Sequence, residues 1–130
     1  MQEMELAERA VACKHWRWMP GMLVMDNLRI HRVDSDGNAA SYIEKSNYVA
    51  WIQRDGIPDL TDPATLGCLL ALVRETWGVP QLFVESWIAI DTKRLRWSLQ
   101  GHIDLRERMS GNRIYDTEAE ALVAALEAAP

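Results

Sequence analysis

The chain has 130 residues, 48 % of them hydrophobic and 25 % charged, a composition typical of one globular domain rather than of a disordered chain. A formal net charge of −5 disfavours long polyanions such as duplex DNA, because an acidic surface repels them. The longest apolar run, Leu66 to Val73 around Gly67, is too short to cross a membrane. We therefore expect a single domain over residues 1–130, with no membrane partner and no long nucleic acid.

The charge is unevenly distributed along the chain. Residues 91–115 carry six basic and three acidic side chains, which gives this segment +3 and leaves −8 for the remainder. Two interpretations fit this basic segment: a solvated hairpin face, or a site for one small anion or an acidic protein surface.

The N-terminal segment predicts a helix over Gln2–Lys14, where Leu6, Ala10 and Cys13 recur at helical spacing. Pro20 and the glycine after it prevent the helix from continuing. The acidic start of the chain lacks the basic and apolar regions of a signal peptide, so we expect none.

A strand region is predicted to follow, because the next stretches are apolar and partly β-branched. Asp34 to Asn38, "DSDGN", predicts a hairpin turn since Asp-Gly and Gly-Asn adopt positive φ easily. The predicted strands are Met22–Met25, Leu28–Val33, Ser41–Ile43 and Tyr48–Ile52, and the following "RDGIPD" is predicted to be a loop.

The sequence "DLTDPATLGCLLALVRETWG" predicts a second helix with Asp62 as N-cap, Pro63 at the first helical position and Gly78 as the stop. Gly67 lowers helix propensity, and we interpret it as allowing close approach to a sheet. The predicted apolar stripe is Leu66, Leu70, Val73 and Trp77, widened by Leu69 and Leu72.

A hairpin is predicted next, with strands at Gln81–Ile90 and Leu95–Gln100 joined around "DTKR". Trp87 and Trp97 are expected to face each other across it. Thr117 to Glu120, "TEAE", is a capping box that opens the last helix. This order of elements predicts an α+β fold, with an antiparallel sheet and three helices packed on it in an α/β/α sandwich-like arrangement.

No sequence pattern of catalytic or metal chemistry occurs. The three histidines are scattered, and there is no G-x-S-x-G, P-loop or G-x-G-x-x-G sequence. Cys13 and Cys68 fall in predicted helices without a C-x-x-C pair, so we expect reduced core residues. We therefore expect no catalytic residue, no metal and no cofactor, and a protein that is not an enzyme.

Six tryptophans against one phenylalanine are the unusual feature, because tryptophan is enriched at binding sites. In "HWRWMPGM", Trp16 and Trp18 share one face of an extended chain, with Arg17 opposite. They form either a stacking platform for a ligand or plugs of the core, and we expect at least one plug. The predicted ligand-binding residues are Trp16, Arg17, Trp18, Arg94, Arg96, Trp97, Arg106, Arg108 and Arg113.

Three stretches carry a resemblance: "WRWMPGM" after an amphipathic helix, "PDLTDPATLGCLLALVRETWG", and the terminal "TEAEALVAALEAA". Their order resembles a group of small phage and prophage proteins and is similar to the phage ABA-sandwich domain. In that domain too, a tryptophan follows helix one, a P-x-x-T-D turn opens helix two and an alanine-rich helix closes the chain. The resemblance implies an α/β/α sandwich, a phage accessory gene and the bacterial host cytoplasm, and it carries over no catalytic residues.

We therefore expect a non-catalytic phage accessory binding protein that antagonises host defence. It would sequester a small anionic, nucleotide-like signal, with tryptophan stacking and arginine neutralising phosphate, or it would grip a host defence protein. The alternatives are a structural or assembly accessory protein of a phage and a small nucleotide-processing enzyme. Uneven charge also makes a homo-oligomer an expectation.

Overall fold

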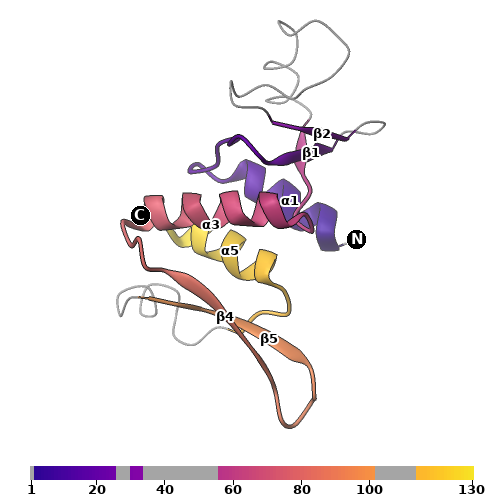
Figure 1. The fold of residues 1–130 in the computed structure, drawn as a ribbon, viewed down its shortest axis with the longest axis vertical. Coiled ribbons are helices and arrows are strands. Elements are labelled where there is room, and N and C mark those ends of the chain that lie inside the picture. The colour runs from indigo at the N-terminus through magenta and orange to yellow at the C-terminus, as the bar shows by residue number, and fades with distance from the viewer. Residues whose placement is uncertain (1, 26–29, 34–55, 102–113) are drawn as a thin grey trace, which may run out of the picture. The chain divides into compact units, whose positions relative to one another are not determined.

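The computed structural model describes residues 2–25, 30–33, 56–101 and 114–130 (Figure 1). These form three helices and two small antiparallel sheets, the α+β fold class expected from the sequence. The helices are α1 (Gln2–Ala12), α3 (Pro63–Trp77) and α5 (Glu118–Ala128). The strands are β1 (Leu23–Met25), β2 (Ile30–Arg32), β3 (Ile57–Pro58), β4 (Phe83–Ile88) and β5 (Leu95–Gln100). No helix in the described part of the chain is long and apolar enough to span a membrane.

The chain forms two compact units. The first comprises Met1–Ala12 and Trp16–Cys68, and the second comprises Cys13–His15 and Leu69–Pro130. Helix α3 runs through the boundary between Cys68 and Leu69. The single domain expected for the whole chain stays a prediction.

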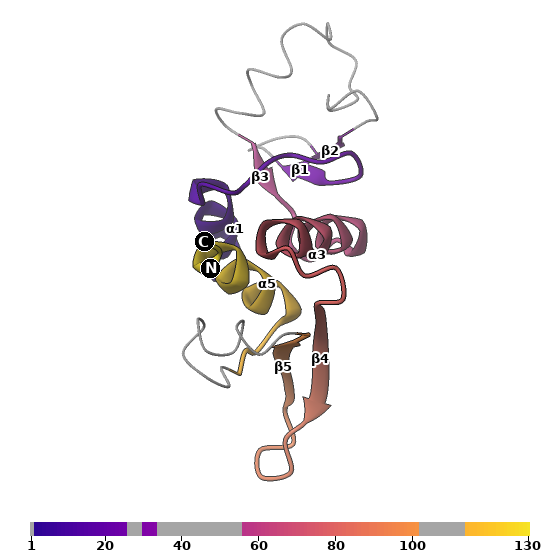
Figure 2. The ribbon, with the colours of Figure 1, turned by 90° about the vertical axis from the view of Figure 1, so that its left-hand side faces the viewer.

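The sheet of the first unit has strand order β2–β1–β3, with both neighbours antiparallel to β1 (Figure 2). Helix α1 packs on β3. Strand β3 contradicts the loop predicted for "RDGIPD": Val24 pairs with Pro58 and Met25 with Ile57. Pro58 lacks an N–H donor, so it is tolerated because β3 lies at an edge of this sheet.

Helix α3 begins and ends where the sequence predicts. The Asp62 carboxylate accepts the backbone N–H of Thr65 at 3.0 Å, and Gly78 terminates the helix at a φ of +68°. The interpretation of Gly67 is wrong, because a Cβ there would meet nothing within 4 Å. The fully buried positions of α3 are Thr65, Leu69, Leu72 and Val73. The buried face of the helix is therefore centred on Leu69 and Leu72, which were expected only at the margin of the apolar stripe.

A polar network joins β1, β2 and the start of α3 within the first unit. Arg32 donates to both Asp62 oxygens, at 3.0 and 3.2 Å, and to the carbonyl of Gly21 at 2.7 Å. The buried Thr65 hydroxyl donates to Asp62 at 2.9 Å and accepts the N–H of Leu23 at 2.8 Å. The Arg32 guanidinium, and then the Thr65 donors, lower the pKa of Asp62 to about 2.

In the second unit, α5 packs on the β4–β5 sheet and is buried on most of its circumference. The Thr117 hydroxyl accepts the N–H of Glu120 at 3.1 Å, which confirms the predicted N-cap. In a capping box the glutamate side chain would accept the N–H of the N-cap residue. Here the Glu120 carboxylate accepts the N–H of Asp116, one residue before Thr117. Trp77 ties α3 to α5 by donating its indole N–H to the Ala125 carbonyl at 2.8 Å.

Both cysteines are free and half-buried. Cys68 lies in α3 as expected, and its thiol donates to the Pro20 carbonyl at 3.3 Å. Burial raises the pKa of the Cys68 thiol, which favours the protonated form. Cys13 lies one residue beyond the end of α1, not inside it, and donates to the Leu126 carbonyl at 3.4 Å.

Some predicted elements lie outside the described residues. These are the "DSDGN" turn, the strands predicted at Ser41–Ile43 and Tyr48–Ile52, and three of the candidate ligand residues, Arg106, Arg108 and Arg113.

Candidate functional site

The candidate site is the β4–β5 hairpin of the second unit. The strands pair antiparallel from Phe83 opposite Gln100 to Ile88 opposite Leu95. Because side chains alternate along a strand, the hairpin has two faces. The first face carries Phe83, Glu85, Trp87, Arg96, Ser98 and Gln100, and the second carries Val84, Ser86, Ile88, Leu95, Trp97 and Leu99.

Large apolar side chains are exposed on both faces and at the tip of this hairpin. Ile90 at the tip is 96 % exposed, Ile88 on the second face 66 % and Trp87 on the first face 37 %. Among the described residues of the second unit, Phe83, Leu95 and Ile114 are also large, apolar and exposed. Clustered apolar exposure of this kind marks interaction surfaces, because water-exposed apolar area is unfavourable without a partner.

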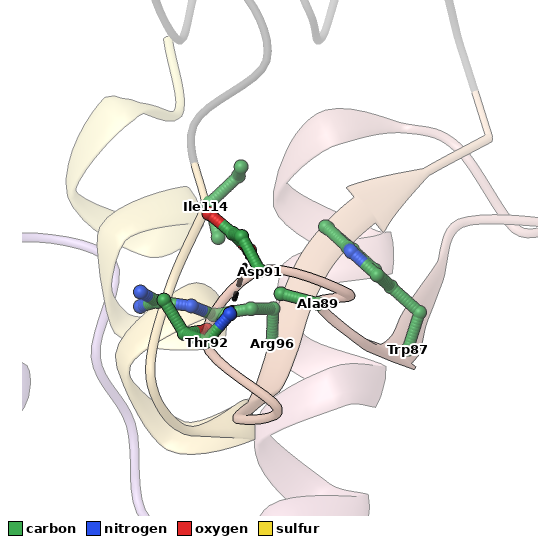
Figure 3. Close-up of a pocket in the computed structure, with 6 residues that line it drawn as sticks. All are labelled: Trp87, Ala89, Asp91, Thr92, Arg96 and Ile114. Carbon is green, nitrogen blue, oxygen red and sulfur yellow. Dashed lines mark hydrogen bonds between the residues drawn. The ribbon is translucent and has the colours of Figure 1, made fainter.

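A cavity of about 220 Å³ opens beside Trp87 on the first face. Figure 3 shows the Trp87 ring and Ile114 on either side of Ala89 in this view. The full lining is Trp87, Ala89, Asp91, Thr92, Arg96 and Ile114. This volume is below the 300–1,000 Å³ or so that encloses a drug-sized ligand, so the cavity fits one side chain better than a nucleotide.

The charges at the cavity largely cancel. Arg96 bonds Asp116 at 2.5 Å, and Arg94 lies 3.6 Å from the same carboxylate oxygen. Asp91 places a carboxylate in the lining itself. An entering phosphate would have to compete with Asp116 for Arg96, so the described residues that line this cavity offer no unpaired cation for phosphate recognition.

The tip is held by its own backbone. Ala89 donates its N–H to Arg94 at 3.0 Å, and its carbonyl accepts the N–H of Lys93 at 2.7 Å. The Asp91 carboxylate accepts the N–H of Thr92 at 2.9 Å. Lys93 adopts a φ of +56°, which closes the loop as a left-handed residue does in longer hairpin turns. Ile90 is therefore displayed on a hydrogen-bonded loop that also carries the exposed Asp91 and Lys93.

The candidate tryptophans of "HWRWMPGM" pack in the first unit. Both Trp16 and Trp18 pack on a buried cluster formed by Met22, Val24 and Val33, which confirms the expectation of at least one plug. Their ring centroids lie 5.3 Å apart with the planes at 87°. This edge-to-face contact stabilises the pair but leaves no parallel slot for a base between them.

The remaining described candidates are only partly brought together. Arg94 and Arg96 converge on Asp116, but Trp97 lies on the other face, opposite Ser86. Trp87 is opposite Arg96, so the prediction that the two tryptophans face each other is wrong. Arg17 is exposed in the first unit.

Sequence reasoning missed the apolar tip and the carboxylate that neutralises the arginines. A signal for the first was present in "FVESWIAI": large apolar residues occupy neighbouring positions 83–84 and 87–88, so both faces of the strand are apolar. Asp116 had no such signal, because its pairing depends on the backbone bridge between Trp97 and Tyr115.

No protein-family model, curated protein or solved structure matches the chain. Among the described residues, no group of three or more metal-ligating side chains gathers at one place.

Proposed function

We propose that this is a non-catalytic binding protein that grips a partner protein through the β4–β5 hairpin. The observation that carries the proposal is the hydrogen-bonded tip with Ile90 96 % exposed. Exposed anchors of this kind bind by entering a pocket on a partner.

The partner chemistry follows from the tip. Lys93 lies beside the apolar anchor and is exposed, so the complementary surface is an apolar groove with a carboxylate at its edge. The neighbouring 220 Å³ cavity would receive one apolar side chain from that partner. Nucleotide sequestration is the weaker version of the proposal, because the cavity is small and Arg96 is already paired with Asp116.

The biological role in this proposal rests on the sequence resemblance to phage accessory proteins. On that basis the protein acts in the bacterial host cytoplasm, and the gripped partner is a host defence protein. The homo-oligomer expected from the sequence stays a prediction.

The test places a photo-cross-linking amino acid at position 90 and, as control, at Met4, which is also exposed but lies on α1. A host protein captured only from position 90 is then purified and titrated against the Ile90→Asp and Met4→Asp variants. We expect Ile90→Asp to raise the Kd about tenfold or more, roughly 1.4 kcal/mol, and Met4→Asp to leave it unchanged. Both sites are exposed, so the fold should tolerate either change.

Equal binding by the two variants contradicts the proposal, as does a failure to capture any protein specific to position 90. A third outcome favours sequestration instead: a nucleotide that raises the Tm of the wild type, with the shift lost in Arg96→Ala.

A further inference from the structure

The outer edge of β4 is a second surface, distinct from the tip. The other edge of the hairpin is occupied, because Trp97 of β5 exchanges two backbone hydrogen bonds with Tyr115, at 2.9 and 2.8 Å. Within residues 2–25, 30–33, 56–101 and 114–130, no strand pairs with the outer side of β4. Such an edge presents unpaired N–H and C=O groups and is a template for another strand.

The hydrogen-bond alternation fixes which residues of β4 point outward. Ala89 donates its N–H to the carbonyl of Arg94. In an antiparallel pair of strands every second residue pair is hydrogen-bonded in this way, so Trp87 and Arg96 also direct their backbone groups to each other. Ser86 and Trp97 lie opposite each other but form one of the pairs between these, whose backbone groups point away from the partner strand. Trp97 accordingly bonds Tyr115 on the outer side of β5. The N–H and C=O groups of Val84, Ser86 and Ile88 therefore face the outer edge.

We propose that two copies of this chain pair through their β4 edges, antiparallel and centred on Ser86. A two-fold axis perpendicular to the sheet then places Ser86 opposite Ser86 of the second copy, and Val84 opposite Ile88 of the second copy. Every outward backbone group of these residues obtains a partner, since each such pair exchanges two N–H···O=C bonds. The two hairpins form one continuous sheet.

The side chains favour this register over the one centred on Glu85. Val84 and the exposed Ile88 become a cross-strand apolar pair on the second face, which stabilises a sheet. Moving the axis to Glu85 would place two carboxylates directly opposite each other, and directly opposed like charges destabilise strand pairing. The second copy is thus the occupant whose chemistry fits this edge.

The pairing leaves the Ile90 tips unpaired, and it places Glu85 of the second copy opposite Trp87 on the first face. Because the axis is perpendicular to the sheet, the first faces of the two copies lie on the same side. A dimer would therefore display two Ile90 tips from one sheet. The inference stands independently of the proposed partner, since it uses the strand edge and not the tip.

The test measures molar mass by sedimentation at about 100 µM, a concentration suited to a small, transient interface. We expect the wild type to sediment at twice its 14.8 kDa. Ser86→Lys and Ser86→Glu should each be monomeric, with the dimer Kd raised about tenfold or more, because the introduced charge faces itself across the axis. An equimolar mixture of the two variants should recover the dimer, which also shows that each variant is folded.

Cysteine cross-linking tests the register. Ser86→Cys should form an intermolecular disulfide under oxidation, since directly opposite strand residues lie within disulfide reach. Glu85→Cys, the matched control, should cross-link poorly because its counterpart is displaced along the strand.

A monomeric wild type, a dimeric Ser86→Lys variant, or faster cross-linking through position 85 would each overturn the inference. Ile90→Asp should remain dimeric, so failure of the edge pairing and failure of partner binding are distinguishable.

Discussion

Replacing Asp62 tests the network that joins β1, β2 and the start of α3. Asp62→Ala removes the N-cap of α3, which costs about 1 kcal/mol. It also leaves the fully buried Thr65 hydroxyl without its acceptor, which costs about 1–3 kcal/mol. The exposed Arg32 adds little, because solvent screens its ion pair. We therefore expect a loss of about 2–4 kcal/mol in the free energy of unfolding.

Asp62→Asn separates the charge from the hydrogen bonds. The amide oxygen still accepts from Thr65, so this variant should lose less stability than Asp62→Ala in urea denaturation. Asp59→Asn is the matched control, because within the described parts of the chain the Asp59 carboxylate accepts only local bonds, from the N–H and hydroxyl of Thr61 at 2.9 and 2.6 Å. If Asp62→Ala lost no more stability than Asp59→Asn, the assigned network would be wrong.

The pH dependence of the Asp62→Asn difference has a definite sign. The pKa of Asp62 falls from 3.8 to about 2 in the folded protein, so the stabilisation by its charge is complete above pH 3.8 and disappears as the pH falls through about 2. The excess stability of the wild type over Asp62→Asn should therefore shrink across this window, because only the wild type takes up the proton. A difference that stays constant from pH 5 to about pH 2 would refute the role given to the charge.

Further variants test the core and the glycines. Trp16→Phe should lose less stability than Trp77→Phe, by about 1 kcal/mol. The buried Trp16 N–H has no acceptor among the described residues, whereas Trp77 donates to a carbonyl of α5. Equal losses of stability in thermal denaturation would contradict this. Gly67→Ala should raise the free energy of unfolding by about 1 kcal/mol, since a Cβ there meets nothing within 4 Å. Gly101→Ala should lower the free energy of unfolding by about 2 kcal/mol or more. The Cβ of the alanine would lie 2.7 Å from the Cα of Leu82, and the backbone φ there is +135°. A variant as stable as the wild type would contradict this clash.

The helices were predictable because their signals are local. Asp62 bonds a residue three positions later, and Thr117 does the same at the start of α5. Such contacts depend on neighbouring residues and not on the rest of the fold. The glycine that ends α3 acts equally locally, through its own φ.

The candidate site was less predictable because it depends on strand register. Trp87 and Trp97 were expected on one face, but the observed register pairs Trp87 with Arg96. A shift of one residue moves a side chain to the opposite face, and here the shift is set by the loop conformation that Lys93 closes at positive φ. Lysine gives no sequence signal for that conformation, which glycine or asparagine would have indicated.

The missed strand β3 has a related cause. It consists of only Ile57 and Pro58, too few residues to show alternation. The sequence signal at this position came from proline and glycine, which predict loops. Its pairing is therefore evident only once β1 is present to receive it.

The apolar pattern of β4 explains why one hairpin carries two surfaces. A strand with one buried face alternates apolar and polar residues, but "FVESWI" places apolar residues on both faces. Pairing at the β4 edge would bring Val84 and Ile88 of the two copies together, and it would leave the tip for a foreign partner. If both proposals hold, two tips on one sheet would bind an oligomeric partner more tightly than a single tip, because the second contact is intramolecular. Ser86→Lys would then weaken binding to an oligomeric partner but not to its isolated subunit, whereas Ile90→Asp would weaken both.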